Sequence, residues 1–266
     1  MRIGIVGCGG RMGRMLMREV LGTPGATLSG GTVRPGNPHL GADLGVLAGL
    51  DPAGVTATDD AEALFAASDA IIDFTTPAAT PLHADLAARH GTALVIGTTG
   101  LTAEQQAAID TAAAKAALVQ APNMSLGVNL LLALVEDVSR TLGPDVWDIE
   151  IVEMHHRHKV DAPSGTALGL GRAAASGRGV DLAAVSDRVR DGHTGARETG
   201  HIGFATLRGG DVVGDHTVIF AAEGERIELT HKAGSRAIFA RGAVRAAVWA
   251  GARQPGLYSM RDVLGL

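Results

Sequence analysis

Short apolar runs alternate with longer stretches of helical periodicity through the first half of the chain. Strands are expected over 3–6, 27–33, 70–74, 93–96 and 118–120. Apolar residues at i, i+3 and i+4 predict helices over about 11–21, 61–67, 78–90 and 103–116, and a further helix over about 128–142 closes this half. Strands that alternate with helices form βαβ units, whose strands are parallel. The fold class expected here is α/β, with an N-terminal Rossmann-type parallel sheet.

The pattern changes after Gly143 and Pro144. Residues 148–154 alternate like a half-buried strand, and a helix is expected over about 165–176. Three further strands, over 202–207, 213–220 and 226–230, follow one another with short turns between them. Strands without intervening helices favour an antiparallel or mixed sheet, so a second, α+β domain is expected. Helical spacing returns after Ser235, and this tail is expected to fold back on the first half.

Composition and charge narrow the function classes. Hydrophobic residues make up 46% and charged residues 19% of 266 residues, which is typical of a globular protein. A net charge of −5 argues against nucleic-acid and membrane-surface partners, which need broad positive fields. No apolar run approaches the ~20 residues that span a bilayer, and a strand pattern begins at once without a signal peptide, so a cytoplasmic protein is expected. The single cysteine, Cys8, excludes an internal disulfide and a cysteine-rich zinc site.

A glycine-rich loop separates the first expected strand from the first expected helix. The candidate cofactor-binding residues in it are Gly7, Cys8, Gly9, Gly10, Arg11 and Met12. Glycines let the backbone approach a pyrophosphate, and the helix start binds the anion through its N–H groups and dipole. Met12 stands where the usual dinucleotide pattern has its third glycine, with Gly13 next. The alternative is a tight turn without a ligand, but the position at a strand–helix junction favours a dinucleotide.

The residues after the second expected strand bear on the choice of dinucleotide. NAD-binding domains usually have an acidic residue here, which holds the ribose hydroxyls. Val33 occupies that place and Arg34 follows it. An arginine pairs with a 2′-phosphate, so Arg34 favours NADPH over NADH, unless it is a surface arginine at a strand end.

Three more loops follow strands that end at the same edge of the expected sheet. They lie at 74–77, 97–100 and 121–124, and ligands of open parallel sheets bind beyond this edge. Their hydroxyls, backbone amides and the Asn123 side chain suit a nicotinamide ribose and carboxamide. The candidates taken from these loops are Gly97, Thr98, Thr99, Ala121, Pro122, Asn123 and Met124.

The densest group of reactive side chains lies at 153–166. His155, His156, His158, Lys159 and Arg157 fall within five residues, which is costly unless the run faces solvent or an anion. Ser164, Gly165 and Thr166 follow at an expected helix start, which provides a second anion site. Histidine moves protons near neutral pH and lysine donates to developing negative charge, so a pocket for a carboxylate-bearing substrate is expected.

Other interpretations of this run are a solvated basic loop, a metal site and a nucleic-acid patch. Charge runs are often solvated surface. Cationic neighbours disfavour a metal, and no cysteine accompanies the histidines, so no metal site is expected. The run is short, lacks flanking aromatic residues and lies in an acidic protein, which disfavours nucleic acid.

Together these motifs resemble the dihydrodipicolinate reductase family. The resemblance rests on Gly-x-Gly-Gly-Arg-Met-Gly, on Gly-Thr-Thr-Gly and Ala-Pro-Asn-Met-Ser, and above all on His-His-Arg-His-Lys with Pro-Ser-Gly-Thr. It continues through 202–208, 214–217, 230–233 and 260–264, and so covers essentially the whole chain.

The resemblance implies NADH- or NADPH-dependent reduction of the 4-hydroxy-tetrahydrodipicolinate-level intermediate to tetrahydrodipicolinate, in diaminopimelate and lysine biosynthesis. It implies His155 as proton donor or acceptor, Lys159 as proton donor, and His156 with Gly165 and Thr166 as the carboxylate site. It also implies a small dicarboxylate substrate and a homotetramer. The dinucleotide-binding domain is expected over 1–126 and 236–266, and the substrate-binding and oligomerisation domain over 127–235.

Two other functions remain open on the residues alone. One is another two-domain NAD(P)-dependent dehydrogenase, although a thioester-forming type needs a cysteine in its second domain and Cys8 lies in the cofactor loop. The other is a non-enzymatic dinucleotide sensor, which has no need of the group at 155–159.

Overall fold

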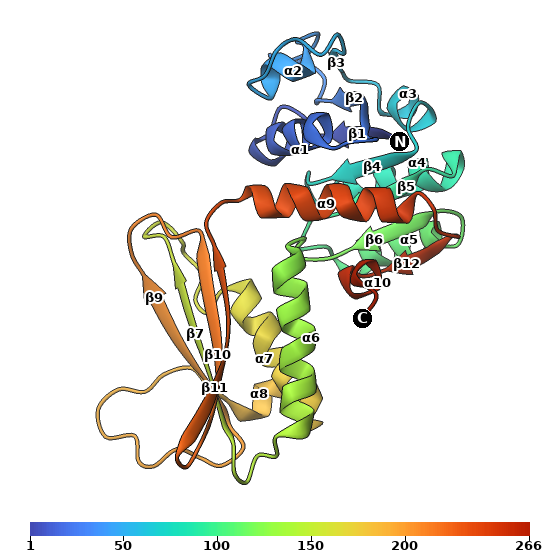
Figure 1. Ribbon diagram of the computed structural model, residues 1–266. Helices are drawn as coiled ribbons and strands as arrows, with labels where there is room; N and C mark the ends of the chain where they lie inside the picture. The colour runs from blue at the N-terminus through green and yellow to red at the C-terminus, as the bar shows by residue number, and fades with distance from the viewer. The chain divides into compact units, whose positions relative to one another are not determined.

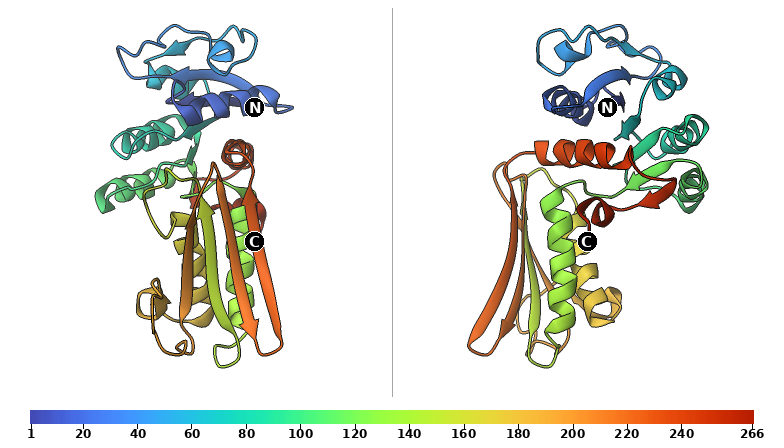
Figure 2. Two further views of the ribbon diagram at one scale, coloured as in Figure 1. Left: turned by 90° about the vertical axis from the view of Figure 1, so that its left-hand side faces the viewer. Right: turned by 45° about the vertical axis from the view of Figure 1, so that its right-hand side comes forward.

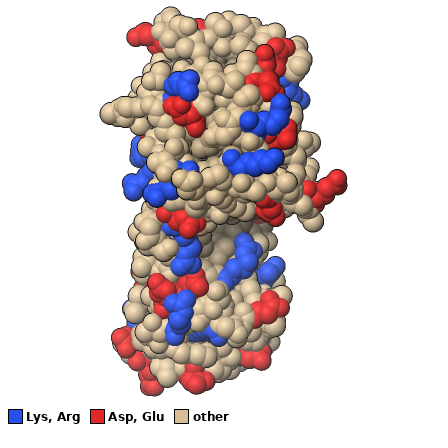
Figure 3. All heavy atoms as spheres, turned by 90° about the vertical axis from the view of Figure 1, so that its right-hand side faces the viewer, with Lys and Arg blue, Asp and Glu red and all other residues tan.

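The computed structural model describes residues 1–266, which divide into two compact units. The first unit consists of Met1–Leu126 and Ala237–Leu266, and the second of Gly127–Arg236. Figure 1 shows the chain leaving the first unit through α6 and returning to it in α9. None of the helices is long and apolar enough to span a membrane. On the face drawn in Figure 3, Lys and Arg side chains are interspersed with Asp and Glu side chains.

The first unit is an α/β fold around a seven-stranded sheet. The strands have the order β12-β6-β5-β4-β1-β2-β3, and every pairing in it is parallel. Its strands are β1 (Arg2–Val6), β2 (Thr27–Thr32), β3 (Ala57–Thr58), β4 (Ala70–Asp73), β5 (Ala93–Ile96), β6 (Ala117–Gln120) and β12 (Gly256–Tyr258). Its helices are α1 (Arg11–Gly22), α2 (Leu44–Leu47), α3 (Ala61–Ala66), α4 (Thr80–His90), α5 (Ala103–Ala113), α9 (Ala237–Ala250) and α10 (Met260–Leu264).

Helices cover both faces of this sheet, which is why its central strands are apolar throughout. Buried residues of α1 and α9 pack on one face, with Leu16 and Val244 among them. Buried residues of α3, α4 and α5 pack on the other face, around Phe65 and Ile109. The strand order reverses between β1 and β4, and a crevice at such a reversal is where ligands bind in open parallel sheets.

The second unit is a five-stranded sheet with helices on one face (Figure 2). Its strand order is β11-β10-β7-β9-β8; β10 is antiparallel to β7 and β11, whereas β9 is parallel to β7 and β8. Its elements are α6 (Leu126–Thr141), β7 (Asp148–His155), α7 (Gly165–Arg178), α8 (Leu182–Val185), β8 (Ser186–Asp187), β9 (Ile202–Arg208), β10 (Gly214–Ala222) and β11 (Glu225–Ala233). Ile149, Ile151 and Val218 pack against α6 and α7 in a separate core.

The structure differs from the sequence-based expectations mainly in short elements. The expected strand over 226–230 is longer, because β11 pairs with β10 along its whole length. The helix expected to reach residue 116 ends at Ala113, and the strand expected to reach residue 74 ends at Asp73. The pattern did not predict α2, α8, α10, β3, β8 or β12, because these helices have at most five residues and these strands at most three, which is too few to show a periodicity.

Candidate active site

The glycine loop leads into a helix start that no side chain caps. Gly10 is the N-cap of α1 in extended conformation. By contrast, Thr102 and Gln105 form a reciprocal capping box at the start of α5. The first N–H groups of a helix have no partners within it, so the start of α1 presents donors and a positive dipole end to a phosphate.

Close packing behind the loop depends on Gly13 rather than on position 12. A Cβ at Gly13 would lie 2.4 Å from the Gly7 carbonyl oxygen, so α1 crosses the end of β1 without room for a side chain. Met12 packs its side chain against the core and has only its backbone to offer a cofactor. The packing role of the usual third glycine therefore falls to Gly13, which the sequence analysis noted directly after Met12.

Cys8 faces the core and not the ligand edge. Its side chain is fully buried, and burial raises the pKa of its thiol to about 11. A thiol this buried and this weakly acidic stays protonated at neutral pH. Cys8 therefore contributes backbone to the loop, and its side chain fills space beside Gly31.

Cationic side chains gather beyond the end of β2. Arg34 is exposed, directly after the buried Val33. Arg14 from α1 reaches the same region, with its Nη2 3.1 Å from Nε2 of His39. His39 also borders the glycine loop, because a Cβ at Gly9 would lie 3.0 Å from its Cδ2. Sequence analysis identified Arg34 and missed Arg14 and His39, whose spacing along the chain gives no sign of this convergence.

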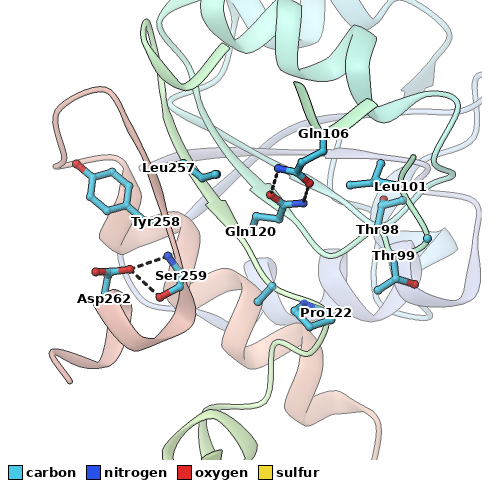
Figure 4. Close-up of a pocket in the computed structure, with 12 residues that line it drawn as sticks. Thr98, Thr99, Leu101, Gln106, Gln120, Pro122, Leu257, Tyr258, Ser259 and Asp262 are labelled. Carbon is cyan, nitrogen blue, oxygen red and sulfur yellow. Dashed lines mark hydrogen bonds between the residues drawn. The ribbon is translucent and has the colours of Figure 1, made fainter. Parts of the chain in front are cut away.

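The loops after β5 and β6 line a pocket of about 570 Å³. Figure 4 shows Thr98, Thr99 and Pro122 on one side, and the Gln106–Gln120 pair with reciprocal side-chain hydrogen bonds of 2.8 and 2.9 Å. The last wall comes from the short elements β12 and α10, which the sequence did not predict. The residues that line the pocket are Thr98, Thr99, Gly100, Leu101, Gln106, Gln120, Ala121, Pro122, Leu257, Tyr258, Ser259 and Asp262.

In the second unit, Glu153 holds His155 in one orientation. The Glu153 side chain is 1% exposed and accepts a hydrogen bond from His155 Nδ1 at 2.5 Å. It also accepts two bonds from the Arg208 guanidinium, at 2.8 and 3.0 Å, and one from the Ser164 backbone N–H at 2.9 Å. Burial works to raise the pKa of Glu153, but the bonds from Arg208 and His155 outweigh it and lower this pKa. The ionised carboxylate fixes the proton on Nδ1 and leaves Nε2 for proton exchange.

Two neighbours on β10 complete the surroundings of His155. Gly214 lies opposite it, and a Cβ at Gly214 would come within 2.9 Å of His155 Nε2. His216 packs edge-on against His155 at 5.1 Å between ring centroids, and its Nε2 lies 3.0 Å from Ser164 Oγ. Burial, followed by the charge of His155, lowers the pKa of His216 to about 4. His216 is therefore a neutral neighbour at physiological pH.

The loop after β7 carries the remaining cations. Lys159 Nζ lies 2.8 Å from Asp161 Oδ1, so this lysine is paired within its own loop. His156 Nε2 lies 3.4 Å from an Arg236 guanidinium nitrogen. Desolvation, then the charges of Arg236 and His158, lower the pKa of His156. Such a group of like charges is relieved by an anion bound among them.

Ser164 caps α7 rather than facing outward. It is 1% exposed, and its hydroxyl accepts a bond from the Ala167 N–H. Its contact with His216 occupies the same oxygen. Gly165 is exposed and Thr166 half-buried, so the first turn of α7 is accessible at these two residues.

The structure places every candidate cofactor residue in the first unit and every candidate catalytic or substrate residue in the second. Comparison with known proteins identifies both parts. The family profile described as "Dihydrodipicolinate reductase, N-terminus" matches residues 1–124, and "Dihydrodipicolinate reductase, C-terminus" matches residues 127–264. The chain belongs to the dihydrodipicolinate reductase family.

Individual relatives agree. A protein of Rhizobium rhizogenes named 4-hydroxy-tetrahydrodipicolinate reductase is 56% identical over all of this chain and 97% of its own length. One of Rhodopseudomonas palustris with the same name is 59% identical over all of this chain and 98% of its own length. The family assignment and fold class predicted from the sequence are thus confirmed.

Solved structures extend the likeness. A dipicolinate-bound dihydrodipicolinate reductase from Paenisporosarcina sp. TG-14 has a TM-score of 0.78 and 25% identity, covering 98% of both chains. An amine dehydrogenase from Mycobacterium smegmatis has a TM-score of 0.61 and 14% identity, covering 98% of this chain and 95% of its own, which shows a shared fold alone.

Membership of the dihydrodipicolinate reductase family sets the reaction class. The chain is an oxidoreductase that carries out the reduction of 4-hydroxy-tetrahydrodipicolinate in diaminopimelate and lysine biosynthesis. Its Rossmann-type unit is the nucleotide-binding part, which implies use of NADH or NADPH.

Proposed function

We propose that this chain uses NADPH in preference to NADH, takes a small dicarboxylate as its substrate, and protonates the product through His155 and Lys159. The observation that carries the proposal is the buried Glu153–His155 pair, set beside the start of α7 and a loop of cations. A histidine held at 2.5 Å by an ionised carboxylate is oriented for proton transfer, and a merely solvated basic loop has no need of it.

The first unit provides a cradle that fits a dinucleotide. The uncapped start of α1 faces the pyrophosphate position, and Gly7, Gly9 and Gly10 keep side chains out of the way. Thr98, Thr99 and the loop from Ala121 to Met124 lie beyond neighbouring strands, where the nicotinamide end belongs. A bound reduced nicotinamide supplies the hydride.

Two guanidinium groups and one histidine support the preference for NADPH. Arg34 follows β2 where an acid would serve NADH, and Arg14 and His39 lie at the adjoining edge of the glycine loop. A 2′-phosphate carries close to two negative charges, and guanidinium groups bind it through charge-assisted hydrogen bonds. The ribose hydroxyls of NADH gain nothing comparable from these groups.

The second unit provides sites for carboxylates. The start of α7 at Gly165 and Thr166 offers backbone donors, Arg236 and Lys159 offer cations, and His156 offers an imidazole. The dipicolinate bound by the related Paenisporosarcina protein is a ring with two carboxylates, which supports the same substrate class for this chain. Substrate binding would draw Lys159 away from Asp161 and free its ammonium to donate.

The two proposed catalytic groups, His155 and Lys159, are both placed to transfer a proton to the substrate. Hydride addition leaves electron density on the substrate that must be protonated, and nearby cations stabilise it as it forms. His155 exchanges its proton at Nε2 while Glu153 keeps Nδ1 protonated. Lys159 is the second donor, and its half-buried side chain lies between the exposed residues His158 and Val160.

We also propose that the second unit assembles a homotetramer through the open face of its sheet. Alternation along β7 puts Ile149 and Ile151 into the core, so Val152 and Met154 lie on the other face. Register places Leu207, which is half exposed, beside Met154. Apolar side chains on an uncovered sheet face are suited to pairing with another copy.

The proposal is tested by following oxidation of NADPH and of NADH with enzymatically generated 4-hydroxy-tetrahydrodipicolinate. Wild type, Lys159→Ala and the exposed control Lys115→Ala are run side by side. We expect wild type and the control to oxidise NADPH faster than NADH, and Lys159→Ala to lose at least a hundredfold in kcat, as is typical when a general acid is removed. Oxidation by Lys159→Ala at the wild-type rate would refute the proton-donor role, and dinucleotide binding without oxidation by wild type would favour a sensor.

A further inference from the structure

A fully buried carboxylate lies at the end of β4, among the loops proposed to hold the nicotinamide. Asp73 is 0% exposed. Its Oδ1 accepts hydrogen bonds from the backbone N–H of Thr75 at 2.8 Å and the hydroxyl of Thr75 at 2.6 Å. The same oxygen accepts the hydroxyl of Thr98 at 3.1 Å. One carboxylate oxygen therefore joins the loop after β4 to the loop after β5.

The two loops also contact each other directly. The backbone N–H of Thr75 lies 3.1 Å from Thr98 Oγ1, so Thr98 both donates to Asp73 and accepts from the neighbouring loop. The ring of Phe74 covers Gly97, where a Cβ would come within 2.3 Å of it. Thr98 is in turn part of the pocket wall drawn in Figure 4, next to Thr99. A change in the bonds to Asp73 therefore reaches the pocket wall in one step.

The other oxygen of Asp73 is held from the opposite side. Oδ2 accepts from the Thr80 hydroxyl at 3.0 Å and lies 2.8 Å from His83 Nδ1, both on α4. Burial works to raise the pKa of Asp73, but His83 and the bonds from Thr75 outweigh it and keep this pKa lowered. The carboxylate thus stays ionised where no solvent reaches it. A buried charge is expensive, and every donor around it is supplied by α4 or by the two loops.

We propose that Asp73 is a positioning residue for the dinucleotide: its Oδ1 sets the loops after β4 and β5, and so fixes the backbone of Gly97, Thr98 and Thr99 against the nicotinamide end. This inference rests on the proposed function of these loops in cofactor binding. Asp73 touches neither the reacting atoms nor solvent, and it acts through Thr75 and Thr98. On the α4 side, Thr80 and His83 anchor the carboxylate; the Thr80 hydroxyl also lies 3.3 Å from the Thr76 carbonyl of the loop after β4, but neither side chain bonds to the loop after β5.

Two isosteric variants separate the two sides of the carboxylate. Thr98→Val removes the hydroxyl on Oδ1, and the matched control Thr80→Val removes a hydroxyl on Oδ2. Both lose one hydrogen bond to the same buried charge, so similar losses in thermal stability are expected. NADPH affinity is measured by fluorescence titration, and KM values for NADPH and for the dicarboxylate are measured separately. We expect Thr98→Val to weaken NADPH about tenfold, and Thr80→Val by less than about twofold, with the KM of the dicarboxylate unchanged in both.

A second pair keeps the test independent of folding. Asp73→Asn retains one acceptor oxygen for Thr75 and Thr98, whereas Asp73→Ala retains none. We expect Asp73→Asn to stay within about threefold of wild type in NADPH affinity and Asp73→Ala, if folded, to lose more than Thr98→Val. Equal NADPH affinity in Thr98→Val and Thr80→Val, or parallel changes in both KM values, overturns the inference alone. Wild type that binds no dinucleotide overturns the proposed function, and the inference with it.

Discussion

At the scale of single residues, the choice between NADPH and NADH rests on side chains around the end of β2. Arg34 is exposed and follows the buried Val33, so it is accessible to a phosphate without any rearrangement of the core. We expect Arg34→Ala to weaken NADPH by about ten- to hundredfold, the value of a charge-assisted contact, and to leave NADH within about twofold. Titration of each cofactor measures this, with Arg245→Ala on α9 as an exposed control. Equal losses for both cofactors would mean that Arg34 does not read the 2′-phosphate.

Glu153 orients His155 through a hydrogen bond to Nδ1, and it also accepts bonds from Arg208 and Ser164. Glu153→Gln keeps the shape but replaces one acceptor oxygen with an NH2 group, which must then face either the donors on Oε1, Ser164 N–H and Arg208 Nη2, or those on Oε2, His155 Nδ1 and Arg208 Nη1. We expect kcat to fall by about ten- to a hundredfold and the dissociation constant of NADPH to stay unchanged, since Glu153 lies outside the cofactor unit. Glu150→Gln, on the opposite face of β7, is the matched control and should retain kcat. A normal kcat in Glu153→Gln would show that His155 needs no fixed orientation.

At the scale of elements, the sequence predicted the features that depend on residues close together along the chain. Apolar periodicity located the long helices and central strands, and the junction of β1 with α1 indicated the anion site before any coordinates. The site residues that the sequence did not predict are those that strand pairing brings together from distant parts of the chain. β10 is antiparallel to β7, and His216 pairs with Glu153, so two residues further along Gly214 lies opposite His155. The spacing of these residues along the chain does not predict this contact. The register of β9 against β7 likewise brings Arg208, from β9, within reach of Glu153.

The open face of the second sheet bears on the whole molecule. If four copies assemble through it, light scattering should give four times the chain mass of 27.1 kDa. We expect Val152→Glu to reduce the mass to that of a smaller species, because a charge in an apolar interface is costly to bury. Thr76→Glu, an exposed change in the first unit, should leave the mass unchanged. A wild-type chain that is monomeric at assay concentration would contradict the tetramer.

Stability against acid is a second property of the whole molecule. His216 has a folded pKa of about 4 against an ordinary 6.5, so the unfolded state binds more protons between these values. Unfolding free energy therefore falls as pH drops from 6.5 to 4, by on the order of 3 kcal/mol from this group. The lowered pKa values of Asp73 and Glu153 add their loss only at lower pH, below their ordinary values of 3.8 and 4.5.

Denaturant unfolding at several pH values tests this assignment. His216→Gln removes the titrating ring and keeps a polar partner for Ser164, so its unfolding free energy should fall less between pH 6.5 and 4 than that of wild type. His193→Gln, which changes an exposed histidine of the second unit, serves as control and should keep the wild-type slope. Equal slopes in wild type and His216→Gln would mean that another group carries the acid sensitivity.

Because the chain returns to the first unit at its C-terminal end, the order of synthesis affects which unit can fold first. Residues 1–126 leave the ribosome before α9 exists, although α9 packs on β4, β5 and β6 and β12 completes the sheet beside β6. Until then Val95 and Val119, on the face that α9 will cover, have no complete apolar cover. Gly127–Arg236 is contiguous and needs nothing made later. The unit translated second can therefore finish folding first, and a chain released after Arg236 would contain a complete second unit and a nucleotide-binding unit that lacks α9, β12 and α10.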